Sequence, residues 1–156
     1  MSDVQPIPAG FNTVTPHLII KDAAQALEFY QRAFGAENLG QMLTPDGKKV
    51  IHGMMRIGDS MVMLTDEFPE CLHPFVSPKT NQGTTITMHL YVDDADAAYQ
   101  RAVDAGCTPN MPPMDAFWGD RYGQVFDPFG HAWSIASHHR DVTPQEMEQA
   151  AAQMFQ

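Results

Sequence analysis

The sequence predicts an α+β fold made of two consecutive copies of one βαβββ unit. The ten residues HLIIKDAAQA at 17–26 recur as HLYVDDADAA at 89–98, an offset of 72 residues. The same offset carries Gly58 of RIGDSMVML onto Gly130 of PFGHAWSIA. In both copies an apolar run typical of a strand precedes a helical pattern and three more short strand patterns. Two separate matches at one offset indicate a duplicated module.

The first module is expected over residues 12–66. It begins with the apolar strand VTPHLII. Asp22 then stands at the N-cap position of a helix whose apolar residues recur every three or four positions, and Gly35 ends that helix. Three strands should follow, separated by turns at 45–47 and at Gly58-Asp59: one around Asn38–Leu43, one in KVIHGMMRI and one in SMVMLTD.

The second module is expected over residues 84–138 and repeats this order. TTITMHLYV is its first strand, Asp94 caps its helix, and Gly106 ends the helix. Three strands then run to about Ser137, with DPFG as the last turn, because Pro and Gly stand at the positions that a type I turn favours.

Two further segments lie outside the modules. Residues 67–83 are rich in Pro and turn formers and have no periodicity, so we interpret them as a linker or a lid loop. Residues 141–156 should form a C-terminal helix, because Thr143, Pro144 and Glu146 stand at the N-cap, N1 and N3 positions.

Composition narrows the class of protein. The chain has 156 residues, enough for one ordinary domain, and a net charge of −10 that disfavours nucleic acid and anionic membranes as partners. No apolar run approaches the roughly 20 residues that span a bilayer, and the first residues do not resemble a secretory signal. Cys71 and Cys107 lack metal-type spacing. We therefore expect a soluble, cytoplasmic protein with reduced thiols.

The tandem βαβββ pair, with a histidine on the first strand of each half and DPFGHAW at the last hairpin, resembles the vicinal oxygen chelate superfamily. Glyoxalase I, the bleomycin-resistance proteins and the extradiol dioxygenases belong to it. FYQRAFGA, WGDRYG and DPFGHAWSIA are similar to its PhnB-like branch. The resemblance covers about residues 12–140. It implies a single domain over residues 1–140, in which the modules form a strongly curved mixed sheet around a cavity, paired within one chain or swapped between two.

The resemblance also implies candidate metal ligands on the first and last strands of each module. The first-strand positions are His17 and His89, and His52 could supply a third imidazole. With a substrate or another ligand, these residues could hold a divalent metal such as Zn, Ni, Mn or Fe. The alternative is a pair of pocket histidines, bonded to the backbone or to Ser134, because an unpaired buried imidazole is costly.

Neither carboxylate that the metal-using relatives carry is expected to be present. The position in the second module falls on Ser134, and that in the first falls on Met63 or Val62, depending on the alignment of the hairpin. An efficient glyoxalase I needs a carboxylate to move a proton between carbons. We therefore do not expect efficient glyoxalase I activity.

The loop before the penultimate strand supplies candidate ligand contacts. Phe117 and Trp118 could stack on a flat ligand, or pack against a partner subunit. Arg121 could clamp an anion through its planar guanidinium, or form a structural ion pair. Because successive strand residues face opposite sides, Asp120 and Arg121 cannot both line a cavity.

The last strand and the methionines complete the predicted site. Alternation places Ala132, Ser134 and Ala136 on one face, with Trp133 on the other, against the helices. We predict that His17, His89 and Ser134 face a common cavity. The many methionines suit an adaptable apolar cavity or an ordinary core. The catalytic candidates are Asp120, Arg121 and Ser134, and the ligand-binding candidates are Phe117, Trp118, Arg121, Met63 and Ser134.

Three functional hypotheses follow. The first is a homodimer that binds or transforms a small, partly apolar molecule in a cleft, with a divalent metal as in a lyase, isomerase or dioxygenase. The second is a metal-free binding protein that sequesters a small molecule such as an antibiotic. The third, a protein-interaction module, depends on the C-terminal helix and the Pro-rich loop at 67–83. His138 and His139 are interpreted as exposed, with no assigned role.

Overall fold

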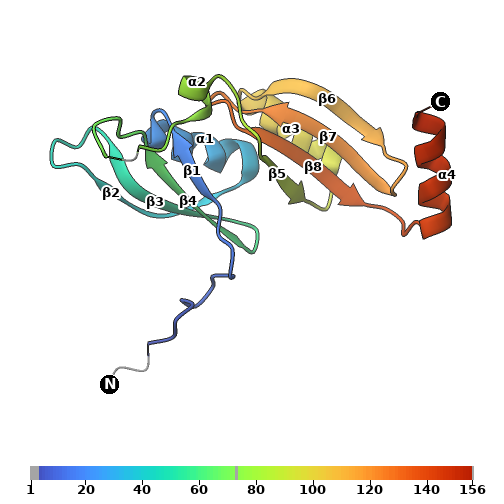
Figure 1. Cartoon of the computed structure of the whole chain (residues 1–156), viewed down its shortest axis with the longest axis horizontal. Helices are drawn as coiled ribbons and strands as arrows, with labels where there is room; N and C mark the ends of the chain where they lie inside the picture. The colour runs from blue at the N-terminus through green and yellow to red at the C-terminus, as the bar shows by residue number, and fades with distance from the viewer. Residues whose placement is uncertain (1–3, 73, 156) are drawn as a thin grey trace. The chain divides into compact units, whose positions relative to one another are not determined.

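A computed structural model describes residues 4–72 and 74–155 (Figure 1). The chain divides into two compact units, Met1–Gly83 and Thr84–Gln156, and each contains one predicted βαβββ module. In each unit a helix lies against one face of a four-stranded sheet (Figure 1). The predicted α+β class and the tandem modules are confirmed.

The first unit forms a sheet of order β1-β4-β3-β2. β1 pairs in parallel with β4, and the other neighbours are antiparallel. Its elements are β1 (His17–Ile20), α1 (Ala23–Phe34), β2 (Glu37–Leu43), β3 (Val50–Ile57) and β4 (Ser60–Asp66).

Helix α1 begins and ends at the predicted caps. The Asp22 side chain accepts a hydrogen bond from the backbone N–H of Gln25, and Gly35 adopts the left-handed conformation, with φ 67°. The buried face of α1 packs on the sheet, where Gly53 of β3 makes room for the Leu27 side chain. Burial of this apolar stripe stabilises a helix whose 12 residues would be marginal alone in water.

Asp66, at the end of β4, ties α1 to the sheet. One carboxylate oxygen accepts the backbone N–H groups of Asp22 and Ala23 at 2.9 and 3.0 Å, and the other accepts the N–H of Val50 at 2.7 Å. The residue is 7% exposed. A single buried carboxylate therefore pairs three backbone donors from two different elements.

The second unit repeats the topology as a sheet of order β5-β8-β7-β6, with β5 parallel to β8. Helix α3 packs on β6, β7 and β8. The elements are β5 (Thr87–Tyr91), α3 (Ala95–Ala105), β6 (Thr108–Asp115), β7 (Asp120–Phe126) and β8 (Ala132–His138). The predicted caps of α3, Asp94 and Gly106, are confirmed.

The DPFG turn serves the core of the second unit. Asp127 accepts the backbone N–H groups of Phe129 and His131, both at 2.9 Å, and the indole N–H of Trp133 at 2.8 Å. Trp133 is completely buried. The turn thus positions the largest core side chain and satisfies its polar group.

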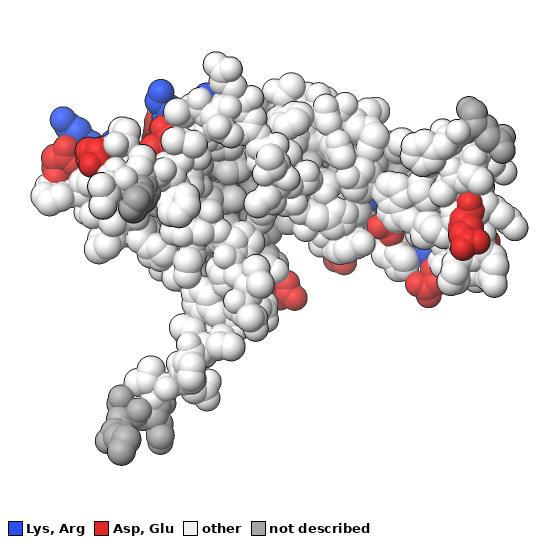
Figure 2. All heavy atoms as spheres, in the orientation of Figure 1, with Lys and Arg blue, Asp and Glu red and all other residues white. Residues whose placement is uncertain are grey.

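In the described part of the chain, two helices lie outside the modules: α2 (Pro78–Asn81), within the predicted linker, and α4 (Pro144–Met154). Thr143 and Glu146 form the predicted capping box of α4. Across the described residues, no helix has the length and apolar character needed to cross a membrane. On the face seen in Figure 2, Lys and Arg atoms form small separate groups rather than a continuous basic patch.

Candidate functional site

The face of the second sheet opposite α3 gathers most of the polar and aromatic candidates. Gly123 of β7 lies against Tyr99 of α3, and Arg121 is ion-paired with Asp96 of the same helix. Odd-numbered positions of β7 therefore face α3, and even-numbered positions face away from it. We call this second side the open face. Its residues, matched by strand register, are Thr87, His89 and Tyr91 of β5, Ala132, Ser134, Ala136 and His138 of β8, and Asp120, Tyr122, Gln124 and Phe126 of β7.

His89 stands near the middle of the open face. Its Nδ1 lies 2.6 Å from the hydroxyl oxygen of Ser134, which is 1% exposed. The His89 ring meets Tyr91 edge to face, with centroids 4.6 Å apart, and stacks on Tyr122 at 5.9 Å. His89 therefore forms the bond to Ser134 that was one of the two alternatives for the first-strand histidines.

The bond between His89 and Ser134 selects one tautomer. The Ser134 hydroxyl hydrogen would be buried without an acceptor if Nδ1 carried the proton, which would cost about 1–3 kcal/mol. Donation from Ser134 to Nδ1 avoids this cost and puts the proton on Nε2. His89 therefore presents an N–H donor on the open face.

A chain of side-chain amides continues from His89 across the sheet. Asn110 of β6 donates to Gln124 at 2.8 Å, and Gln124 donates to the Tyr122 hydroxyl oxygen at 2.7 Å. Because the Tyr122 oxygen already accepts a hydrogen bond, its own O–H is left as a second donor.

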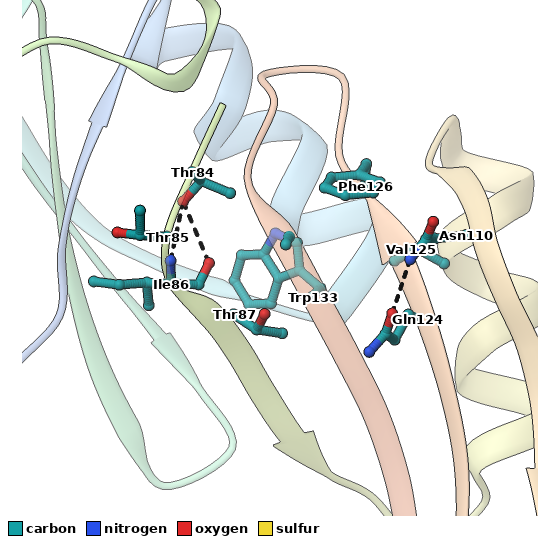
Figure 3. Close-up of a pocket in the computed structure, with 10 residues that line it drawn as sticks. Thr84, Thr85, Ile86, Thr87, Asn110, Gln124, Val125, Phe126 and Trp133 are labelled. Atoms are coloured by element: carbon teal, nitrogen blue, oxygen red, sulfur yellow. Dashed lines mark hydrogen bonds between the residues drawn. The ribbon is translucent and has the colours of Figure 1, made fainter. Parts of the chain in front are cut away.

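A pocket of about 210 Å³ lies beside this chain (Figure 3). Trp133 and Val125, both almost completely buried, form its inner wall, and Asn110 and Gln124 line one side. The remaining lining residues are Thr84, Thr85, Ile86, Thr87, Phe126 and Ala132. The pocket thus combines hydroxyl and amide groups with an apolar wall.

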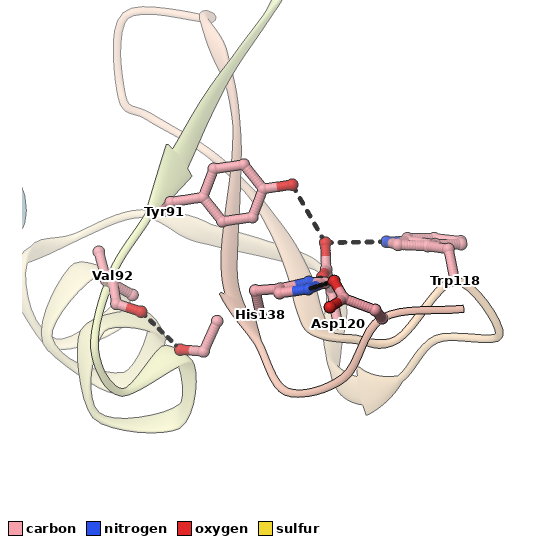
Figure 4. Close-up of polar contacts among 7 residues, drawn as sticks. Tyr91, Val92, Trp118, Asp120 and His138 are labelled. Atoms are coloured by element: carbon pink, nitrogen blue, oxygen red, sulfur yellow. Dashed lines mark hydrogen bonds and ion pairs between the residues drawn. The ribbon is translucent and has the colours of Figure 1, made fainter. Parts of the chain in front are cut away.

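Asp120 organises the other end of the open face (Figure 4). Its carboxylate, which is 3% exposed, accepts hydrogen bonds from the Trp118 indole at 3.0 Å, the Tyr91 hydroxyl at 3.3 Å and His138 Nδ1 at 2.7 Å. Burial alone would raise the pKa of this carboxyl. The hydrogen bonds from His138, Trp118 and Tyr91 outweigh burial and hold the pKa below its ordinary value. Asp120 is therefore an ionised anchor for two aromatic rings.

His138 links this anchor to the segment after β8. Its Nδ1 faces Asp120, and its Nε2 lies 2.9 Å from Asp141. The hydrogen bonds to Asp120 and then to Asp141 raise the pKa of the imidazole above its ordinary value of 6.5.

We predict that the contribution of His138 to stability depends on pH. Because its pKa is raised on folding, the contribution is fully present below the unfolded value of 6.5 and is lost as pH rises through the folded value. His138→Asn should therefore lower the free energy of unfolding more at about pH 5.5 than at about pH 9, as measured by urea denaturation. The exposed neighbour His139, changed to Asn, is the control. Equal losses at both pH values for His138→Asn would contradict the assignment.

The other candidates from this loop, Phe117, Trp118 and Arg121, do not all lie on the same side of the sheet. Trp118 meets Tyr122 edge to face at 5.3 Å, and Phe117 packs on Trp118 in the same way at 5.1 Å. Arg121 instead forms two bonds of 2.9 Å with Asp96 and one of 3.4 Å with Asp115. Of the two alternatives for Arg121, an anion clamp and a structural ion pair, the guanidinium therefore forms the ion pair, on the side of α3.

The first module brings two other candidates together. The His17 ring on β1 lies 5.9 Å from the His52 ring on β3, at an interplanar angle of 80°. Met63 of β4 is the register partner of His17, whereas Val62 is 3% exposed and belongs to the core. Of the two residues that the sequence left open, Met63 therefore stands opposite the first-strand histidine, as Ser134 does opposite His89.

The donor set within each module does not fit a divalent metal centre of the histidine–carboxylate type. Such centres in enzymes generally take about three protein ligands, and a thioether or a neutral hydroxyl replaces the carboxylate here. Within residues 4–72 and 74–155, no group of three or more His, Cys, Asp or Glu side chains is placed to hold a metal ion. His17 and His89 lie in different units, each described by itself.

Two βαβββ modules in tandem, each with a histidine on its first strand, define a class of paired-module α+β proteins. The chain belongs to the Glyoxalase/Bleomycin resistance protein/Dioxygenase superfamily, whose family model matches residues 10–135. The resemblance found from the sequence motifs is therefore confirmed.

Related proteins cover most of the chain. An uncharacterized protein of Mycobacterium bovis is 46% identical over 138 residues, which are 88% of this chain and 90% of that protein. The X-ray structure of the Arabidopsis thaliana gene product At5g48480 is 30% identical, with a TM-score of 0.64, over 81% of this chain and 98% of that one. The fosfomycin resistance protein FosX of Listeria monocytogenes, solved with Mn(II) and sulfate, shares the fold alone: 16% identity and a TM-score of 0.61, over 90% and 97% of the two chains.

Several residues of the open face were not among the sequence candidates. Tyr91, Tyr122 and Gln124 could have been found by applying strand alternation from His89 and Asp120, since they share the same faces. His138 is exposed, as the sequence predicts, but it has a structural role that the sequence does not reveal, since it lies two residues after Ala136 on the same side of β8 and pairs with Asp120. Its pairing with Asp120 has no signal in the sequence.

Proposed function

We propose that this protein binds a small, flat, partly apolar molecule on the open face of its second module, without a divalent metal. The observation that carries the proposal is the cluster of His89, Tyr91, Tyr122 and Trp118, held by the hydrogen bonds to Ser134 and Asp120. Aromatic rings held in this way offer a stacking surface at little cost in conformational entropy.

The polar groups of the face support a ligand with hydrogen-bond acceptors. The Nε2–H of His89 and the hydroxyl of Tyr122 are donors, and Asp120 is already occupied by three donors of its own. A planar ring that carries a carbonyl or hydroxyl oxygen would therefore meet both an apolar surface and N–H or O–H partners. The adjoining pocket of about 210 Å³ is smaller than typical ligand pockets of about 300–1,000 Å³, so it would hold only one part of such a molecule, with the rest on the open face.

The binding proposal is tested with 7-hydroxycoumarin, a flat ring system that carries such oxygens. Its binding should quench Trp118 fluorescence, and Tyr122→Leu should weaken binding about tenfold, since stacking of an aromatic pair contributes about 0.5–1.5 kcal/mol beyond buried area. Ser134→Ala should also weaken binding, because it releases the His89 tautomer. The control is Phe155→Leu, which changes an exposed aromatic residue on the C-terminal segment.

Two outcomes would contradict the proposal: no saturable quenching by this and related planar probes, or equal affinity in the wild type and in Tyr122→Leu.

A separate assay tests for glyoxalase I chemistry. Because Ser134 and Met63 provide no carboxylate base, turnover of methylglyoxal with glutathione should stay far below about 1 per second after reconstitution with Zn, Ni, Co or Mn. Turnover in the usual enzyme range would favour a metal-dependent lyase or isomerase instead.

We further propose that the protein acts in the cytoplasm as a homodimer. The exposed apolar side chains on its strands support this assembly, among them Met42 and Leu43 of β2 and Met114 of β6.

A further inference from the structure

Helix α4 has no role in the proposed ligand binding, and its own chain leaves it largely uncovered. All of α4 lies within the described part of the chain, and none of its residues is buried. Figure 1 shows it apart from the sheet, joined to β8 by the short segment 139–143. It also lies beyond residues 10–135, which the family model matches. A helix of 11 residues is marginal alone in water, so α4 needs a surface on which to pack.

One side of α4 is apolar. Its apolar residues recur every three or four positions, the spacing that places side chains on one face of a helix. Met154 is 62% exposed and Phe155 is 88% exposed. The opposite face carries the uncharged polar residues Gln145, Gln149 and Gln153. We call the apolar side the α4 stripe; it consists of Met147, Ala150, Ala151 and Met154, with Phe155 at its end.

The α4 stripe is symmetric about its centre, because its order is Met, Ala, Ala, Met from either end. A two-fold axis between Ala150 and Ala151 would place Met147 of one antiparallel helix opposite the partner's Met154, and Ala150 opposite the partner's Ala151. Two-fold dimers require this relation, in which residue i contacts residue j and j contacts i. The small alanine side chains at the crossing point let the two helix axes approach closely.

The charges near α4 favour an antiparallel pair over a parallel one. Glu146 and Glu148 stand in the first half of α4, and no charged residue follows them. The Arg140 guanidinium lies 3.6 Å from the Glu146 carboxylate, beside the N-terminal turn. In an antiparallel pair this cation is level with the C-terminal end of the partner helix, which carries the negative end of the helix dipole and has no basic residue in its last turn. Parallel helices would instead bring the like charges of Glu146 and Glu148 together.

We infer that α4 docks on α4 of a second copy of this chain, as an antiparallel helix pair with two-fold symmetry. The inference rests on the homodimer proposed above and assigns its contact to α4. Each helix is about 16 Å long, so the pair buries less than the roughly 1,200–2,000 Å² of a stable interface. The dimer is therefore reversible and dissociates on dilution in the micromolar range.

The contact is tested by sedimentation equilibrium of the full chain between about 1 and 100 µM. Met147→Glu and Met154→Lys should each weaken dimerisation at least about hundredfold, because a charge enters an apolar contact and a two-fold dimer contains each substitution twice. The double variant should recover dimerisation to within about tenfold of the wild type, since each glutamate then faces a lysine of the partner. Gln149→Glu and Gln153→Lys add the same charges to the opposite face of α4. They are the matched controls and should stay within about threefold.

Hydrogen exchange of the wild type provides a second measurement. Because α4 is marginal alone, its amides should be protected at about 100 µM and exchange much faster at about 1 µM, whereas the amides of α3 stay protected at both concentrations.

The outcomes separate this inference from the proposals above. A wild type that stays monomeric at about 100 µM would overturn both the inference and the homodimer, and would leave ligand binding on the open face standing. Three results would overturn the inference alone: α4 amides that stay protected in the monomer, no recovery in the double variant, or dissociation by Met42→Glu in β2 but not by Met147→Glu. The last result would place the contact between copies on the strands.

Discussion

Replacing Asp66 by alanine should lower the free energy of unfolding by about 3–5 kcal/mol. The carboxylate pairs the backbone N–H groups of Asp22, Ala23 and Val50, and it is nearly inaccessible to water. Hydrogen bonds to a charged group contribute about 1.5–3 kcal/mol each, and the donors left behind would be buried without partners. Urea denaturation followed by circular dichroism measures the loss.

Two further variants define the cause of this loss. Asp66→Asn keeps one acceptor oxygen and should lose less than Asp66→Ala. Asp59→Ala, in the exposed turn between β3 and β4, should change stability by less than about 0.5 kcal/mol. A loss below about 1 kcal/mol in Asp66→Ala would show that water or other groups replace the carboxylate.

Gly119→Ala should be the second strongly destabilising change, with a loss of about 3 kcal/mol or more. Gly119 has φ +101°, a conformation that side chains rarely adopt, and an added Cβ would lie 2.0 Å from the backbone oxygen of Arg140. The Gly119 carbonyl also accepts the N–H groups of His139 and Arg140. The substitution therefore combines backbone strain with a collision against main chain that cannot move without breaking hydrogen bonds.

Gly47→Ala separates the two contributions. Gly47 has φ +71°, and nothing lies within 4 Å of the position that its Cβ would take. This variant should lose only about 1–2 kcal/mol, the cost of the left-handed conformation for a residue with a side chain. Thermal unfolding of both variants is the measurement, and equal losses would show that the segment after β8 moves aside without cost.

The elements of this fold follow from local sequence signals. Asp22 and Gly35 bound α1, Asp94 and Gly106 bound α3, and all four caps stand where the sequence predicts them. Caps, turns and alternation depend on a few neighbouring residues, so they can be found without knowing the tertiary structure. The same alternation correctly placed Ser134 and Trp133 on opposite faces of β8.

The choice between Met63 and Val62 as the counterpart of Ser134 depended on the tertiary structure. The offset of 72 relates His17 to His89, but the strand register relates Met63 to Ser134, an offset of 71. The offset falls before the last hairpin: α1 has 12 residues and α3 has 11, so Gly35 and Gly106, which end these helices, are 71 residues apart. A shift of one residue exchanges the two faces of a strand, so the register decides which residue stands opposite the histidine.

The sequence by itself determined the superfamily, the duplicated module, the helix caps and the positions of His17, His89 and Ser134 on their strands. Only the tertiary structure showed that Arg121 pairs with Asp96 and that Asp120 holds Trp118, Tyr91 and His138. Such pairings join residues on different strands and helices. They depend on strand register and helix packing, which are set by the burial of the whole core rather than by neighbours in the sequence.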